Sequence, residues 1–223
     1  MRAVRSRPAG RPRPRVRRSH AERSAATRAR ILAAVVDVIA RHGFQGLTAQ
    51  RIAASSGVTW GAVQHHFGSK DQLLLAVLED SFTRFAERVE RAPLAGRGLA
   101  ARAALFVDLA WEHFRSRPYR AGFEILLNHL GRAEHRGPGN WRIEMSRAWD
   151  RVWSRIFADA KLPRRRSLML QHFTISTLSG LAATLMLQGA AAELPRAELD
   201  VLKATLRREL AARRPDGCAT RIG

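Results

Sequence analysis

The chain has 223 residues, enough for one large domain or for one small and one medium domain. Its hydrophobic fraction of 46% supports a substantial core, and its formal net charge of +20 favours an acidic partner, with nucleic acid as the first candidate. The single cysteine, Cys218, excludes a disulfide framework and a zinc site built on cysteines. There is no membrane-spanning apolar run and no signal peptide, so we expect a cytoplasmic protein.

The positive charge is concentrated in the first 23 residues. This segment holds arginines at 2, 5, 7, 11, 13, 15, 17, 18 and 23 against the single acid Glu22, together with three prolines. It has too few apolar residues to offset the entropy cost of ordering, so we predict that residues 1–23 are disordered in the free protein. Residues 24–80, with five Lys or Arg and four Asp or Glu, are nearly neutral.

Residues 24–68 predict three helices. The first covers 24–42, carries one apolar stripe and ends at Gly43. Two short helices follow at about 49–55 and 60–66, with Thr48 and Thr59 as their N-caps. The turn between them contains Gly57, which tolerates a positive φ. Two short helices joined by such a turn form a helix-turn-helix, which presents its second helix to the major groove of DNA.

The DNA-binding candidates are the outward-facing residues of this unit: Thr48, Thr59, Trp60, Gly61, Gln64, His65 and Lys70. Gln64 has the donor and acceptor that an adenine edge requires. Lys70 follows the cap of the next helix, where backbone N–H groups already favour a phosphate. The alternative is that these residues are merely solvated side chains of a surface helix.

Residues 27–81 resemble the DNA-binding domain of the TetR family of bacterial repressors. The resemblance is carried by HGF, T-x-x-x-I-A, G-V-T-x-G-x-V, H-F and S-K-D-Q-L-L, in register. It implies a homodimer that binds a palindromic operator and is released by a small molecule. One departure is Gln64, which stands where the family usually has an aromatic residue that touches a phosphate.

The remainder of the chain also reads as helical. Ser69 opens a helix to about Arg91, and further helices are predicted at 99–115, 119–130, 141–160, 164–187 and 196–213, with a polar loop at 131–139. Since no segment alternates with a period of two, we predict an all-α fold. We assign 24–68 to the helix-turn-helix domain, 69–214 to a helical ligand-binding and dimerisation domain, and 215–223 to a flexible tail.

Two sets of residues in the second domain suggest further sites. Large apolar side chains with a polar neighbour predict a ligand pocket, lined by Trp111, Phe114, Phe123, Leu127, Trp149, Trp153, Phe173 and Thr177. Helical apolar stripes on the last two helices, together with the TetR resemblance, predict a dimer interface of Phe173, Ser176, Gly180, Ala183, Leu187, Leu199, Leu202 and Leu206. The alternative for the aromatic residues is that they fill a helical core.

The sequence offers no catalytic, cofactor or metal motif, and its histidines lack the spacing of ligands. We therefore predict a non-enzymatic, ligand-responsive transcriptional regulator, a homodimeric repressor of a double-stranded DNA operator. The alternative is an architectural or protein-partnered DNA-binding protein without a small-molecule effector.

Overall fold

The computed structural model describes residues 19–130, 141–189 and 193–211, and within these ranges the regular structure is entirely helical. The predicted all-α fold is confirmed. The elements are α1 (His20–His42), η1 (Phe44–Gly46), α2 (Ala49–Ser56), α3 (Trp60–Phe67), α4 (Lys70–Glu90), α5 (Leu99–Phe114), α6 (Arg117–Ile125), η2 (Leu126–Leu130), α7 (Trp141–Phe157), η3 (Ala158–Ala160), α8 (Arg164–Gln188) and α9 (Arg196–Ala211). None of the described helices has the length and apolar character needed to cross a membrane.

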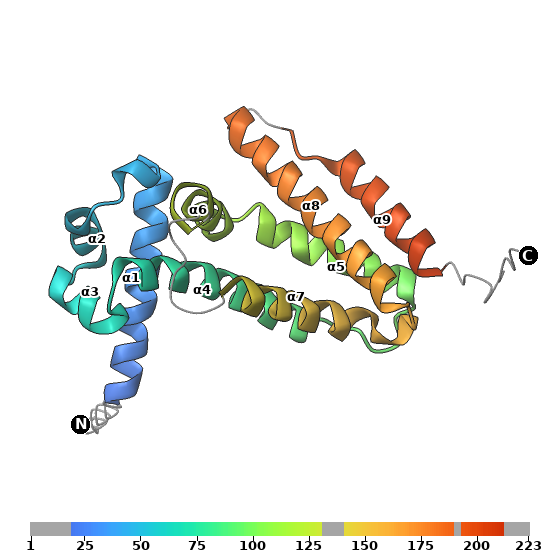
Figure 1. Cartoon of the computed structure of the whole chain (residues 1–223), viewed down its shortest axis with the longest axis horizontal. Coiled ribbons are helices and arrows are strands. Elements are labelled where there is room, and N and C mark those ends of the chain that lie inside the picture. The colour runs from blue at the N-terminus through green and yellow to red at the C-terminus, as the bar shows by residue number, and fades with distance from the viewer. Residues whose placement is uncertain (1–18, 131–140, 190–192, 212–223) are drawn as a thin grey trace, which may run out of the picture.

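The helices form two lobes (Figure 1). The smaller lobe holds α1, α2 and α3, while α5, α7, α8 and α9 make up the larger one. Helix α4 runs from the smaller lobe into the larger one, and α6 lies between the two.

Helix α1 begins at His20, earlier than predicted. Ser19 and Glu22 form a capping box: Ser19 Oγ accepts from the Glu22 N–H at 3.1 Å, and Glu22 Oε2 accepts from the Ser19 N–H at 2.7 Å. The disorder predicted for residues 19–23 is therefore wrong, because this cap starts the helix despite the surrounding arginines. Residues 1–18 lie outside the described part of the chain.

The smaller lobe has one apolar core. It is built from α1, α2, α3 and the first half of α4, and Ala121 and Ile125 of α6 complete it. Leu73, Leu74 and Val77 of α4 are buried here, so this core crosses the boundary that we placed after residue 68. The reason is that α4 is a single helix of 21 residues whose two halves pack into different cores.

The larger lobe has its own core, in which α9 packs against α5. Leu199, Leu202 and Leu206 are buried there within the protomer. Their assignment to the dimer interface is therefore wrong. A periodic leucine stripe shows only that one face of a helix is covered, and here the cover comes from the same chain.

The α-helical part of the predicted 119–130 helix is shorter than expected. Helix α6 is regular from Arg117 to Ile125, and the chain then widens into a π-helix, η2, over Leu126–Leu130. The Asn128 side chain donates to the Glu124 carbonyl at 2.9 Å, which competes with the regular backbone pattern at this point. The polar loop predicted at 131–139 lies outside the described residues.

The turn between α2 and α3 depends on Gly57. Its φ of 65° and ψ of 28° place it in the left-handed region, and its N–H donates to the Ala53 carbonyl at 3.0 Å. A Cβ at this position would have no atom within 4 Å. Any cost of a side chain at Gly57 therefore comes from the backbone conformation and not from a clash.

We expect Gly57→Val to lower the free energy of unfolding by about 1–2 kcal/mol, because a β-branched residue is strained at positive φ. Gly57→Asn should cost much less, since asparagine tolerates this region. Gly98→Val is the matched control, because Gly98 has open space but a φ of −66°. Chemical denaturation measures all three; equal effects of valine at 57 and 98 would contradict the strain argument.

Candidate DNA-binding interface and ligand cavity

Local hydrogen bonds set the entry of the chain into α2 and α3. Thr48 Oγ1 accepts from the Arg51 N–H, and Thr59 Oγ1 accepts from the Ala62 N–H, both at 3.2 Å. The two predicted N-caps are confirmed. Because each cap uses its oxygen as an acceptor, each hydroxyl proton remains available for an outside acceptor.

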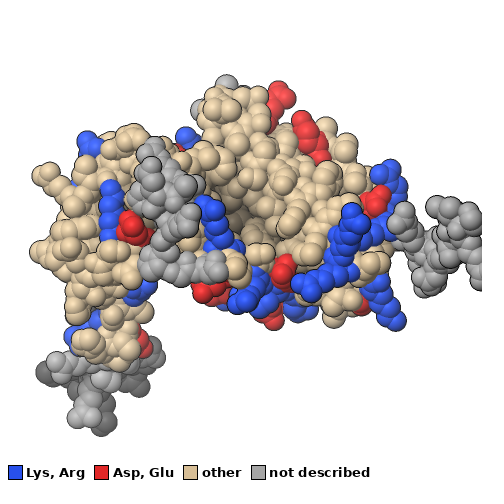
Figure 2. Space-filling view, in the orientation of Figure 1, with Lys and Arg blue, Asp and Glu red and all other residues tan. Residues whose placement is uncertain are grey.

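Helix α3 presents a nearly continuous polar face. Val63 and Phe67 are buried, whereas Gly61, Gln64 and His65 are exposed. Trp60 is half-buried and packs against the core of the smaller lobe, so only part of its ring is accessible. In Figure 2 the face of the smaller lobe over α2 and α3 is largely free of charged side chains. The exposed groups of α3 are thus suited to hydrogen bonding rather than charge pairing.

Two predicted phosphate contacts lie near each other in the structure. Lys70 is the first residue of α4, and its Nζ donates to the Leu47 carbonyl at 3.4 Å, directly before the cap residue Thr48. The predicted capping box of Ser69 and Gln72 is confirmed at the same helix start. A cation and a hydroxyl therefore flank the N-termini of α2 and α4, which favour an anion.

Arg28 of α1 is a supporting residue that sequence reasoning missed. Its guanidinium donates to the His66 carbonyl at 2.6 Å and lies 4.2 Å from the centre of the Phe67 ring. A cation at a helix C-terminus satisfies carbonyls that have no partner within the helix. Arg28 thereby fixes the end of α3, although nothing local in the sequence joins residues 28 and 66.

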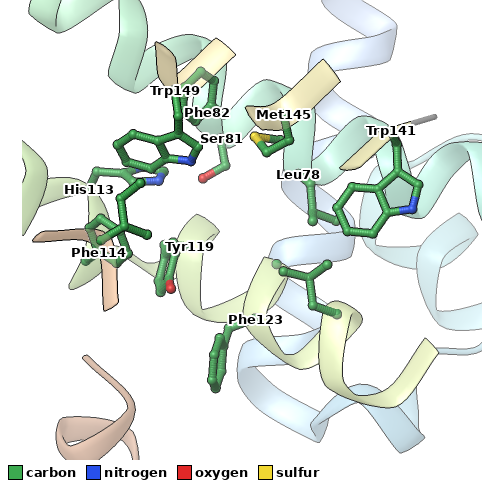
Figure 3. A pocket seen from close by; sticks show the side chains of 13 residues that line it. Leu78, Ser81, Phe82, His113, Phe114, Tyr119, Phe123, Trp141, Met145 and Trp149 are labelled. Atoms are coloured by element: carbon green, nitrogen blue, oxygen red, sulfur yellow. The ribbon is translucent and has the colours of Figure 1, made fainter. Parts of the chain in front are cut away.

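The larger lobe contains a cavity of about 200 Å³. Its walls come from α4, α5, α6, η2, α7 and α8, and Figure 3 shows most of these side chains. The lining residues are Leu78, Ser81, Phe82, His113, Phe114, Tyr119, Gly122, Phe123, Leu126, Trp141, Met145, Trp149 and Ile175.

Three of the predicted pocket residues, Phe114, Phe123 and Trp149, line this cavity. The others do not line it. Trp111 and Trp153 are buried in the core, where the Trp153 N–H donates to Ser167 Oγ at 2.9 Å. Leu127 is 63% exposed on η2. Helical spacing identifies a buried side chain but not the place where packing leaves space.

Phe173 and Thr177, also predicted for the pocket, lie on α8 away from the cavity. Phe173 is 44% exposed, and the Thr177 hydroxyl donates to the Phe173 carbonyl at 2.8 Å. The residues of this helix that are buried in the core are Leu170, Leu178 and Ala182. Phe173 therefore faces outward, as its second assignment to a dimer interface requires.

Sequence reasoning missed the polar groups of the cavity, which are Ser81, His113 and Tyr119. Tyr119 Oη and Ser179 Oγ share a hydrogen bond of 2.8 Å. The His113 ring stacks on Phe85 with 4.9 Å between ring centres and contacts Tyr119 edge-on. Burial, aided by the positive charge of Arg88, lowers the pKa of His113 to about 4. The imidazole is therefore neutral at pH 7.

No group of three or more His, Cys, Asp or Glu suited to a metal ion occurs among the residues that the structure describes.

Comparison with known proteins identifies the family of the smaller lobe. Residues 31–77 match the family model described as bacterial regulatory proteins, tetR family. The helix-turn-helix domain of this chain belongs to the tetR family. The matched residues run from the second half of α1 to the middle of α4, and these helices form the smaller core together with α6.

Curated relatives match part of the chain. The transcriptional regulator CymR of Pseudomonas putida is 38% identical over 79 residues, which is 35% of this chain and 38% of CymR. The transcriptional repressor AcnR of Corynebacterium efficiens is 38% identical over 63 residues, which is 28% of this chain and 34% of AcnR. The chain thus matches less than two fifths of the length of either relative.

The fold of most of the chain is also similar to solved structures. FadR from Bacillus subtilis, described as a transcriptional regulator in complex with stearoyl-CoA, superposes with a TM-score of 0.57 over 82% of this chain and 96% of FadR. The two sequences are 16% identical. This similarity therefore shows the fold and nothing more.

Polar contacts join α6 and η2 to the tetR-family domain. Glu124 Oε2 accepts from the Phe44 N–H at 3.0 Å, and Arg117 forms an ion pair of 2.9 Å with Asp37 of α1. His129 Nε2 lies 2.7 Å from a carboxylate oxygen of Asp71 in the first turn of α4. Since Phe123 of the same helix lines the cavity, α6 is in contact with both sites.

We expect the stability of the protein to fall as the pH drops from about 6.5 to about 4, by up to about 3 kcal/mol from His113. In the unfolded chain His113 takes up a proton near pH 6.5, whereas in the folded protein its pKa is about 4. The stabilisation that comes from the neutral imidazole is therefore fully present above about pH 6.5 and is lost as the pH falls towards 4. His113→Phe should remove this part of the pH dependence. Denaturant unfolding of both proteins at several pH values measures this dependence. If the unfolding free energy varied with pH in the same way in both, the assignment to His113 would be contradicted.

Proposed function

We propose that the chain is a transcriptional repressor that binds a palindromic DNA operator as a homodimer and is released by a small molecule. The observation that carries the proposal is the position of α6 (Figure 1). One face of α6 borders the cavity, and another packs into the core of the tetR-family domain. The protein would act in the cytoplasm, without enzymatic activity.

The residues that contact DNA would have two roles: some would recognise the base sequence, and others would hold the phosphates and so position the protein. Gln64 and His65 on the exposed face of α3 supply hydrogen bonds to base edges in the major groove. The Cβ position of Gly61 is open, with no atom nearer than 3.9 Å. Because glycine has no side chain there, the helix backbone would be able to approach the DNA groove closely. Lys70, with the Thr48 and Thr59 hydroxyls, would hold the backbone phosphates. Trp60, half-buried, would contribute its exposed edge to a sugar or a thymine methyl.

Release would follow from the shared helix. A ligand in the cavity contacts Tyr119 and Phe123 and favours the arrangement of α6 that accommodates it. The contacts of Glu124 and Arg117 with the smaller lobe would then change the spacing of the two recognition helices in a dimer. The complex of FadR with stearoyl-CoA supports the view that this fold can hold a small molecule.

The dimer would form through the outer face of α8. Phe173, Ser176, Gly180 and Leu187 are exposed on this helix, and Ala183 is half-buried between them. Leu187 is 89% exposed, and Val201 of α9 is 66% exposed. A two-fold axis would bring this patch against its own copy, and Gly180, with open space around it, allows close approach.

A DNA-binding protein without a small-molecule effector is the alternative function. In that case the second lobe would bind another protein. The cavity favours the effector, because its lining is mainly aromatic and apolar with a few polar side chains, as in small-molecule sites.

Mutation of Lys70 and Gln64 separates positioning from reading. We expect Lys70→Ala to weaken binding to all DNA sequences alike. It should also reduce the slope of log affinity against log salt concentration by about one unit. Gln64→Ala should lower the preference at one base position by roughly 1–3 kcal/mol and leave the slope unchanged. Arg164→Ala, on the first residue of α8, is the control for a remote lost charge. An unchanged slope for Lys70→Ala, measured by operator titration, would remove the phosphate role.

Placing a charge on α8 tests the dimer. We expect Phe173→Glu to give a folded monomer with greatly weakened operator binding, because two like charges would be buried near the axis. Leu127→Glu is the control, since Leu127 is an exposed apolar residue that lies off this face. Light scattering after size exclusion gives the mass. A dimeric Phe173→Glu protein would move the interface to other helices.

A further inference from the structure

The cavity is walled by aromatic rings from four helices. Phe82 of α4, Phe114 of α5, Phe123 of α6 and Trp149 of α7 surround it, as Figure 3 shows. Phe82 and Trp149 lie edge to face at 5.0 Å between ring centres, and Phe114 and Trp149 are stacked at 5.9 Å. Flat apolar walls of this kind favour a ligand with an aromatic or compact hydrocarbon body.

Ser81 is the one cavity-lining side chain with a buried oxygen that has no hydrogen-bond partner among the described residues. It is 6% exposed, and Figure 3 shows its oxygen turned towards the cavity. Other buried hydroxyls in helices bond to the preceding turn; Thr174, for example, donates to the Leu170 carbonyl at 2.7 Å. An unpaired buried hydroxyl is costly, and a ligand oxygen would satisfy it as donor or acceptor.

The charges around the cavity disfavour an ionic ligand. None of the lining residues carries a carboxylate or a permanent cation. The neutral His113 supplies no ion pair for an anion, while the positive charge of Arg88, which acts on His113, opposes a cation. Taking an ion out of water without a paired charge costs several kcal/mol. An uncharged ligand avoids that cost.

We propose that the cavity binds an uncharged, mainly aromatic molecule with one hydroxyl or carbonyl oxygen, and that Ser81 forms a hydrogen bond with this oxygen. The inference rests on the proposed function, since it gives the chemical class of the effector. The volume of about 200 Å³ is below that of pockets for drug-sized ligands. It corresponds to a ligand of one or two rings, without a long chain.

Naphthalene and three of its derivatives test the class. Naphthalene has no polar atom, 2-naphthol adds a hydroxyl, 2-naphthoate adds a negative charge, and 2-naphthylmethylamine a positive charge at neutral pH. Equilibrium dialysis with the full chain should show 2-naphthol and naphthalene bound, and both ions bound at least tenfold more weakly than 2-naphthol.

The contact with Ser81 is tested on the same compounds. Ser81→Ala should weaken the binding of 2-naphthol about three- to tenfold and leave the binding of naphthalene unchanged, because only the naphthol loses a hydrogen bond. Ser154→Ala, which alters an exposed serine of α7, is the matched control and should change neither. Equal effects of Ser81→Ala on both compounds would overturn the contact.

Operator release is measured separately, so that the two proposals can fail independently. Tight binding of either ion, or binding of none of the four compounds by protein that still binds DNA, would overturn the ligand class and leave the DNA-binding function intact. Serine-dependent binding of 2-naphthol without operator release would support the class and contradict the proposed release.

Discussion

The packing of α6 between two cores is the constraint on which the rest of the structure depends. Ala121 and Ile125 are buried in the core of the smaller lobe, whereas Tyr119 and Phe123 face the cavity of the larger one. A helix of nine residues is not stable in water by itself, so its position is set by what it contacts on both sides. Any change in the cavity therefore bears directly on the contact between Glu124 and Phe44.

The local features of the fold follow from the sequence, because each depends on residues close together in the chain. The caps at Thr48, Thr59 and Ser69 need only a hydroxyl and an N–H within three residues. Gly57 needs only its missing Cβ to adopt a φ of 65°. The same rule explains the error at Ser19, since its capping box with Glu22 is as local and outweighs the basic composition on which we predicted disorder.

The cavity could be predicted only in part, because it depends on distant residues. The sequence predicts Phe114, Phe123 and Trp149, because they are aromatic positions on helices. It does not predict Ser81, because what distinguishes this residue is a hydroxyl without a hydrogen-bond partner, which only the packing of α4 against α5 and α7 reveals. The leucines of α9 show the same limit: their spacing predicts a covered face, but not whether α5 or a second subunit covers it.

The distribution of charge completes the division of roles within the smaller lobe. Helix α3 contains no lysine or arginine, so it offers hydrogen bonds and close approach rather than phosphate attraction. Arg28, the cation nearest to its C-terminus among the contacts described above, is engaged with the His66 carbonyl and the Phe67 ring. Phosphate attraction then falls to Lys70 and to cations outside α3, which leaves the exposed side chains of α3 to distinguish one base sequence from another.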